Sequence, residues 1–289
     1  MSKVIRKAVV SSLLFFFAAH MCAADTASRA KRAEQFAEEA QRALPFAALM
    51  PLAWSDAYIG QLVSRKPHFG GGISYGMTDA GFSAVRDLLN DFGTTAYMDI
   101  STAMMPPVYG HARIGGFFVP FDIGIAGSIP LHIVPADGFS LEQQTFGGDI
   151  RFAFSRDEPK SLGISLGIAY AQTTGHLWAK AEGSDIGIHS SGNAAEIKLQ
   201  VSKTLWTFTP YLGGGGSFTW SRVEYDAANE SGVVTEEWGK EPDQFANGVL
   251  FRVFGGVSMK MWVFQLDFNV NFSIPHGDYG AVLGARFQL

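Results

Sequence analysis

The sequence predicts an all-β fold, a closed antiparallel transmembrane β-barrel of about ten strands with an N-terminal helical segment. Composition is the first support, because the 289 residues are 47% hydrophobic and 17% charged and include 33 glycines. Beyond the N-terminus, no apolar run reaches the ~18 to 20 residues that a membrane-spanning helix needs. The third observation is a repeated alternation of apolar and polar residues, which is typical of strands with one apolar and one polar face.

The first part, residues 1–24, has the features of a secretory signal peptide. A basic patch precedes a mostly apolar run at residues 8–19, and small residues stand at positions −3 and −1 of a cut before Asp25. A lipoprotein cut at Cys22 is the alternative, which the bulky Met21 disfavours. Cleavage before Asp25 removes the single cysteine and leaves 265 residues with a net charge of −8. Disulfides, thiol nucleophiles and cysteine-bound metals are then excluded.

Residues 25–65 form the second predicted part, a helical segment that is either periplasmic or a plug. Alanine and glutamate are frequent up to Leu44, and apolar residues recur there at helical spacing. The apolar run from Ala43 to Trp54 follows, but it is short and contains Pro45 and Pro51. A mobile leader is the alternative role of this segment.

The barrel itself is predicted at residues 66–289. Its clearest strand is Trp262 to Ile274, in which apolar and polar residues alternate over 13 positions. This length exceeds the ~9 to 11 residues that cross a bilayer at a tilt, whereas strands of soluble proteins have about 5 to 6. The same period recurs in nine further segments, at residues 69–77, 108–118, 122–129, 146–154, 162–170, 195–201, 206–220, 249–257 and 279–289.

The links between these ten segments alternate between short and mostly long. Outer-membrane barrels have short periplasmic turns and longer outside loops, and an even strand number leaves both chain ends in the periplasm. Eight or twelve strands are the alternatives, with twelve if residues 94–104 or 175–188 contribute strands. A helix is expected at residues 79–93, either as a lid over the outer mouth or as a helix on the rim.

Two details of single strands are also predicted. Trp206 and Trp220 lie 14 residues apart on the expected lipid face, which fits two aromatic girdles around an apolar band, with ordinary exposed or core aromatics as the alternative. Pro210 lacks an N–H in a barrel without edge strands, so a bulge is expected near it.

The last hairpins allow a prediction of register. A tight turn at Ser258 to Met261 places Val257 opposite Trp262 and Arg252 opposite Asp267. Apolar residues then face apolar residues, and the two charges can pair across the strands.

Three stretches of the barrel part either are rich in glycine or alternate regularly between apolar and other residues. They are Gly115 to Asp122, Pro210 to Gly216 and Tyr279 to Leu289. They resemble the strands and the C-terminal signal of small bacterial outer-membrane β-barrels, with the spirochaetal type as a candidate. The resemblance covers residues 66–289, although such barrels usually end in an aromatic residue rather than in leucine. It implies insertion by the outer-membrane assembly machinery and no particular solute.

Signals for catalysis and metal binding are weak. The histidines never occur in ligand spacing, no G-x-S-x-G elbow is present, and the Gly213 to Gly216 run lacks the lysine and the following helix of a phosphate loop. We therefore predict no enzyme activity, no catalytic residue, no metal and no cofactor. A protease or lipase site assembled from separate strand ends is the alternative. The net charge of −5 also argues against nucleic acid as a partner.

The polar face of the predicted strands defines the candidate site. Eight charged residues are expected in the lumen: Arg113, Asp149, Arg151, Glu196, Lys198, Arg252, Asp267 and Arg286. They share this face with Gln265, Asn269, Asn271, Thr207 and Thr209. Because a ten-stranded barrel is narrow, the charges are expected to form an internal ion-pair network. A selectivity ring for small, in particular anionic, solutes is the alternative.

The function predicted from these features is that of a monomeric barrel of the cell outer membrane, which forms a narrow channel or uptake port for small molecules. The lumenal charges are expected to set selectivity, and one of the two helices to gate the channel. The alternative is a structural or surface-interaction, adhesin-like barrel with a closed lumen. Expected partners are membrane lipid, the assembly machinery and unidentified small solutes.

Overall fold

The structure is a computed structural model that describes residues 43–57, 68–79, 108–116, 120–128, 131–133, 139–155, 161–181, 184–229, 232–239, 248–274 and 277–288. Its strands in chain order are β1 (His68–Asp79), β2 (Val108–Gly115), β3 (Phe121–Ser128), β4 (Leu131–Ile133), β5 (Phe139–Ser155), β6 (Gly163–Ala181), β7 (Ser184–Ser202), β8 (Phe208–Asn229), β9 (Gly232–Gly239), β10 (Val249–Met261), β11 (Phe264–Ile274) and β12 (Tyr279–Gln288). The predicted signal peptide and the predicted helix at residues 79–93 lie outside the described residues, apart from Asp79.

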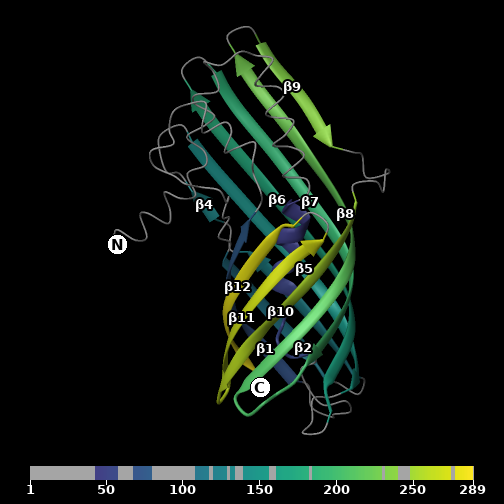
Figure 1. The fold of residues 1–289 in the computed structure, drawn as a ribbon. Helices are drawn as coiled ribbons and strands as arrows, with labels where there is room; N and C mark the ends of the chain where they lie inside the picture. The colour runs from purple at the N-terminus through teal and green to yellow at the C-terminus, as the bar shows by residue number, and fades with distance from the viewer. Residues whose placement is uncertain are drawn as a thin grey trace.

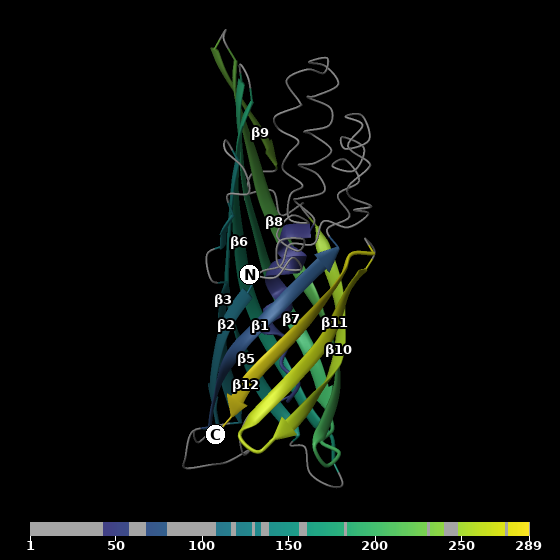
Figure 2. The ribbon, with the colours of Figure 1, turned by 90° about the vertical axis from the view of Figure 1, so that its left-hand side faces the viewer.

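Ten of these strands form a closed antiparallel barrel (Figures 1 and 2). In chain order, and leaving out β4 and β9, each strand pairs with the next, and β12 pairs with β1. Pairing of β8 with β10, from Phe218–Val249 to Phe208–Met259, completes the ring. The predicted fold class and the strand number of ten are confirmed, and each predicted segment overlaps one strand of the ring, although the strand bounds differ.

The strands separate an exposed apolar face from a buried polar face. In β11, Phe264, Leu266 and Phe268 are exposed, whereas Gln265 and Asp267 are buried. Strands β5 to β7 carry the apolar belt as well, through the exposed cross-strand partners Ile150, Ile168 and Ile197. Such a belt suits lipid contact, because exposed apolar side chains in this number would be unfavourable in water.

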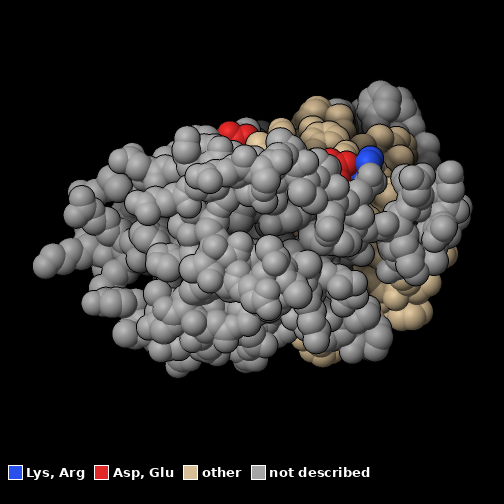
Figure 3. All heavy atoms as spheres, turned by 90° about the horizontal axis from the view of Figure 1, so that it is seen from above, with Lys and Arg blue, Asp and Glu red and all other residues tan. Residues whose placement is uncertain are grey.

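Strands β5 to β8 continue beyond the closed ring and form an extension of the sheet above its rim (Figure 1). Pairing of β8 with β10 ends at Phe218–Val249, whereas β6 and β7 stay paired up to Ala181 and Ser184. The long links predicted at residues 171–194 and 221–248 therefore consist largely of paired strands, a correction to the sequence prediction. Seen from this end, the described residues in view are mainly uncharged, with isolated acidic and basic side chains (Figure 3).

A two-residue turn at Trp262 and Val263 sets the register of β10 and β11. Met261 pairs with Phe264, and Arg252 lies opposite Ser273, so the predicted pairing of Arg252 with Asp267 is wrong. The φ angle of Trp262 is 60°, a left-handed conformation that allows so short a turn. Because the predicted register is shifted by an even number of residues, every side chain still lies on its predicted face.

Trp206 likewise lies in a short turn and not in a strand. Its φ angle is 59° and its side chain is 98% exposed. The bulge expected near Pro210 does not occur in β8, where Val257 of β10 lies opposite the proline in regular register. The Pro210 carbonyl accepts a hydrogen bond from the Lys203 N–H at 3.1 Å, beyond the last pair of β7 and β8, so the missing N–H interrupts no ladder.

Residues 43–57 lie inside the barrel, where residues 43–49 are helical and continue into the short 3-10 helix η1 (Met50–Leu52). All of them are buried except Asp56, which is partly exposed. In the described part of the chain, no helix has both the length and the apolar character needed to span a membrane. We refer to residues 43–57 as the lumen segment.

Candidate functional site in the barrel lumen

The upper half of the lumen is an apolar contact between the lumen segment and small wall residues. Ala48, Leu49 and Leu52 pack in one cluster with the wall alanines Ala126, Ala169, Ala171 and Ala194. Phe46, Ala47 and Met50 pack against Leu250 and Val282. Alanines on the inner wall leave the width that a helix requires, which larger side chains would fill.

Wall glycines also fit the lumen segment closely. A Cβ added at Gly192 would lie 2.8 Å from the Leu44 Cβ, and one added at Gly70 would lie 2.9 Å from the Trp54 ring. Both distances are shorter than a normal contact between carbon atoms. The inner surface of the barrel is thus shaped around the segment.

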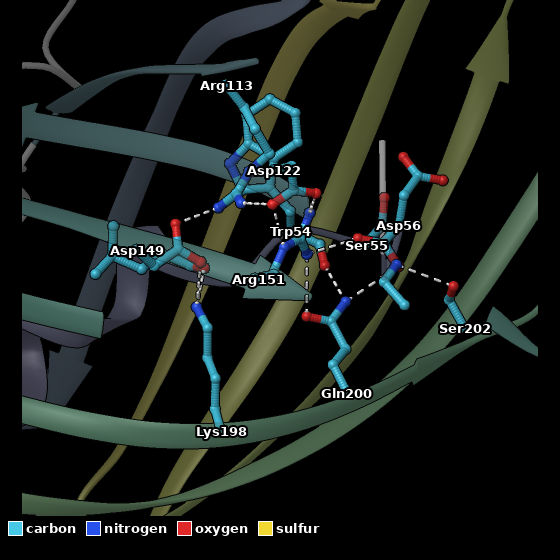
Figure 4. A network of polar contacts seen from close by, with 12 residues as sticks. Trp54, Ser55, Asp56, Arg113, Asp122, Asp149, Arg151, Lys198, Gln200 and Ser202 are labelled. Carbon is cyan, nitrogen blue, oxygen red and sulfur yellow. Dashed lines mark hydrogen bonds and ion pairs between the residues drawn. The ribbon is translucent and has the colours of Figure 1, made fainter. Parts of the chain in front are cut away.

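The lower half of the lumen holds a network of ion pairs (Figure 4). Arg113 pairs with both Asp122 and Asp149, and Arg151 Nη2 contacts Asp122 Oδ2 at 2.7 Å. Lys198 Nζ lies 2.8 Å from Asp149 Oδ2. The side chains of all five residues are at most 1% exposed, so each charge requires its partner in place of water.

Two further groups of ion pairs complete the network. Arg252 binds Glu196 in a bidentate manner, with Nε–Oε1 and Nη2–Oε2 distances of 2.9 and 2.6 Å. Arg286 contacts Asp267 at 3.4 Å and Asp56 of the lumen segment at 3.2 Å. Among the described residues, the network therefore joins five basic side chains to five acidic ones.

Glycines between the charged residues allow pairs to form across an intervening strand. Gly215 of β8 lies opposite both Lys198 and Arg252, and a Cβ on it would come within 2.7 Å of Glu196 Oε1. Arg252 on β10 can therefore reach Glu196 on β7 over β8. Gly124 occupies the same position between Arg113 and Asp149.

The network also binds the backbone of the lumen segment. Arg252 Nη1 donates to the Leu49 carbonyl at 3.0 Å, and Lys198 Nζ donates to the Leu52 carbonyl at 2.9 Å. These carbonyls lie in the last turn of the helix, where backbone carbonyl groups are short of intrahelical N–H donors. Cations at this end also interact favourably with the helix dipole.

Below the helix, Trp54 and the following residues hold the segment to the wall. The Trp54 ring has the guanidinium carbons of Arg113 and Arg286 at 5.1 and 4.5 Å from its centroid. The Trp54 carbonyl accepts a hydrogen bond from Gln200, and the Asp56 carbonyl accepts one from Arg151 at 2.7 Å. Cation–π contacts between desolvated groups are among the stronger ones of their kind.

Little space remains around Trp54. The cavity lined by this ring, Pro51, His111, Asp267 and Arg286 has a volume of about 10 Å³. That volume suffices for about one water molecule. At the level of Trp54, the described residues therefore leave no passage for a solute.

All eight charged residues predicted for the lumen are buried there. Thr209, Gln265, Asn269 and Asn271 are also buried on this face, whereas Thr207 is an exposed turn residue. Sequence reasoning missed Asp122, which begins the predicted segment 122–129 and shares its inward face. It also missed Asp56, and it named a plug as one role of residues 25–65 without assigning the lumen position to the apolar run Ala43 to Trp54. The signal for its burial was the apolar run itself. The run is too short to cross a membrane as a helix, and an apolar run in an otherwise polar segment is expected to be buried.

Metal and cofactor chemistry has no support from side-chain clusters. In the described ranges, no group of three histidine, cysteine, aspartate or glutamate residues could hold a metal ion. The ionisable groups of the lumen are instead engaged with one another and with the lumen segment.

Comparison with known proteins finds likeness in fold. No family model and no curated protein matches the sequence. Among solved structures, the chain is similar to the outer membrane protease OmpT from Escherichia coli, with 10% identity and a TM-score of 0.47 over 78% of this chain and 98% of that one. A major outer membrane protein from Thermus thermophilus has 8% identity and a TM-score of 0.37 over 77% and 99%. The toluene transporter TodX from Pseudomonas putida has 6% identity and a TM-score of 0.34 over 86% and 96%. The structural neighbours are bacterial outer-membrane β-barrels, and at these identities the likeness concerns the architecture alone.

Proposed function

We propose that the protein is a barrel of the bacterial outer membrane that serves as a gated port for small polar solutes, with residues 43–57 as its plug. The observation that carries this proposal is that a separate chain segment fills the lumen, instead of large side chains of the wall. A wall built of alanine, glycine and charged residues leaves a polar passage once the segment moves. The spirochaetal type of barrel stays a proposal for its origin.

The contacts of the plug suit reversible displacement. The lower part is held largely by side chains that donate to backbone carbonyls, and water can replace such donors. The charged wall residues keep partners within the wall when the segment leaves, because Arg252 retains Glu196 and Lys198 retains Asp149. Opening therefore leaves the wall network largely paired.

The outward orientation follows from the turns. The links at residues 116–120, 156–162, 203–207 and 262–263 are short, and the opposite end carries the sheet extension. Short turns face the periplasm in outer-membrane barrels. The extension, with β9, then lies on the cell surface.

Single-channel recording in planar bilayers tests the gated port. The wild-type protein is expected to be closed most of the time, and Trp54→Ala to open more often, because the substitution removes the ring between Arg113 and Arg286. Trp206→Ala is the matched control, since this indole is fully exposed in a turn outside the lumen. Equal open probability of Trp54→Ala and wild type, with both proteins folded, would contradict gating by the plug.

A closed surface-interaction barrel is the second candidate, and the sheet extension favours it. On its outer face a pocket of about 500 Å³ contains stacked His176 and His189, with ring centroids 4.0 Å apart, beside the Arg222–Glu224 ion pair. A polar pocket on an extension above an apolar belt is a suitable contact surface for a polar partner. A folded barrel without residues 43–57 that still conducts no ions would favour this candidate over the port.

A further inference from the structure

The lumen segment crosses the whole height of the barrel in one direction. At the start of the segment, Leu44 packs against Gly192 of β7. The closed ring ends on β7 at the level of Ala195, and Gly192 lies above this level, on the side of the sheet extension. At the last residue of the segment, the Ala57 N–H donates to Ser202 Oγ at 3.0 Å, and Ser202 ends β7 beside a short turn. Gly192 and Ser202 are separated by roughly 33 Å of strand, or about 25 Å along the axis at a ~40° tilt, which equals the thickness of the apolar band.

Charges of the wall fix this direction. The helical part of the segment ends at Leu52, and Lys198 and Arg252 donate to carbonyls of its last turn. In the reversed direction the same cations would face the N–H groups and the positive end of the helix dipole. The arrangement with the helix start at the extended end is therefore favoured electrostatically as well as by packing.

The two ends of the lumen segment lie at opposite ends of the barrel. Ala57 lies beside Ser202 at the short-turn end, and β1 begins at this same end, where His68 pairs with Gly115 beside the short link 116–120. Ala43 is buried at the other end, next to Leu44 and the rim residue Gly192. Ala43 thus marks the end of the lumen segment that lies on the side of the sheet extension.

We propose a further function, in which the barrel holds its own N-terminal segment across the membrane and displays the residues before Ala43 on the cell surface. The inference rests on the proposed function for one point, namely that the extension faces outward. Residues 25–42 contain eight charged side chains among 18, so they suit water and not the lipid phase. The plug is then also the stem of a surface-exposed segment.

Cysteine labelling on intact cells tests the display. The parent protein carries Cys22→Ala and is otherwise free of cysteine. Ser28→Cys reports on the N-terminal segment, Gly183→Cys on the β6–β7 turn of the extension, and Lys160→Cys on the short link between β5 and β6. With a membrane-impermeant maleimide, Ser28→Cys and Gly183→Cys should label on intact cells, and Lys160→Cys only after the outer membrane is permeabilised.

The three positions separate the two proposals. If Ser28→Cys labels together with Lys160→Cys, the threaded direction is wrong, whatever the orientation of the barrel. If Gly183→Cys labels only after permeabilisation and Lys160→Cys labels on intact cells, the proposed orientation fails, and the display on the cell surface fails with it. Heat-dependent gel mobility confirms that each variant is folded before its labelling is interpreted.

A cross-link checks the direction within the lumen independently of the membrane. Leu44→Cys with Gly192→Cys should form a disulfide under mild oxidation, because the two Cβ positions are adjacent. Ala57→Cys with Gly192→Cys is the matched control, and it should stay reduced because its cysteines lie at opposite ends of the lumen. A cross-link in the control pair and none in the first would overturn the proposal.

Discussion

At the scale of single residues, a charge that is buried away from water depends on its ion-pair partner for stability. Arg252 and Glu196 are fully buried and bind each other through two hydrogen bonds, and Arg252 also donates to Asn271 and to the Leu49 carbonyl. Removing either group would destabilise the folded barrel, because the remaining charge in the lumen would lack both water and a counter-ion. Asp267, the partner that strand periodicity suggested, contacts Arg286 instead.

A double-mutant cycle tests this pair. Arg252→Ala and Glu196→Ala are each expected to destabilise the barrel by about 3 to 5 kcal/mol, and the double variant by less than the sum, because it leaves no unpaired charge. Urea unfolding in detergent micelles, followed by heat-dependent gel mobility, measures the free energies. The control cycle combines Arg252→Ala with Asp267→Ala, which should be close to additive. Additive losses in the first cycle would show that Arg252 and Glu196 do not interact.

At the scale of elements, each of the long strands β5 to β8 lies partly in the closed ring and partly in the sheet extension. Their lower parts form the closed ring, and their upper parts pair outside it, where Thr174 of β6 lies opposite Ser191 of β7. The ring is closed below this level by β8 and β10, whose last pair is Phe218–Val249. The extension is therefore an addition to the barrel and not a part of its closure.

Shortening this hairpin should leave the barrel intact. Replacing residues 175–190 with Asn-Gly joins Thr174 to Ser191 through a favourable two-residue turn. We expect the shortened protein to show the same heat-dependent gel mobility as the wild type and to lose only surface epitopes of the extension. The control replaces residues 164–201 and removes most of the ring portions of β6 and β7, which should abolish folding. Failure of the shortened variant to fold in micelles would show that the extension contributes to closure.

At the scale of the whole molecule, the plug completes a balance of charge. With the lumen segment in place, five basic side chains meet five acidic ones, and Asp56 of the segment is one of the acids. When the segment leaves, the ion-pair network in the wall retains its five basic side chains and four acidic ones, while the buried Asp278 binds Ser273 outside this network. The network therefore carries a positive excess at Arg286, which loses Asp56.

The open barrel should accordingly prefer anions. Deletion of residues 43–57 is expected to give a conducting barrel whose reversal potential in a potassium chloride gradient indicates chloride preference. Adding Arg286→Gln should reduce this preference, whereas Arg222→Gln, outside the lumen on the exposed sheet extension, should leave it unchanged. Cation preference of the deletion variant would contradict the role of the lumenal charges in selectivity.

Alternation along the chain was sufficient to predict the class of fold, the number of ring strands and the face of each lumenal charge. These features depend on a period of two residues, which is local and which every strand repeats on its own. Even the wrong register of β10 and β11 preserved the faces, because the shift was an even number of residues. The division into residues 1–24, 25–65 and 66–289 stays a prediction.

The partners of those charges and the contents of the lumen could not be predicted in this way, because they depend on contacts between distant strands. Arg252 reaches Glu196 across β8 because Gly215 leaves the space, and such a pair depends on three strands at once. The lumen segment is placed by the closed ring, since the alanines, glycines and cations that receive Leu52 and Trp54 come from strands far apart in the chain. Alternation along one strand contains no information about these neighbours, because they meet only when the ring closes.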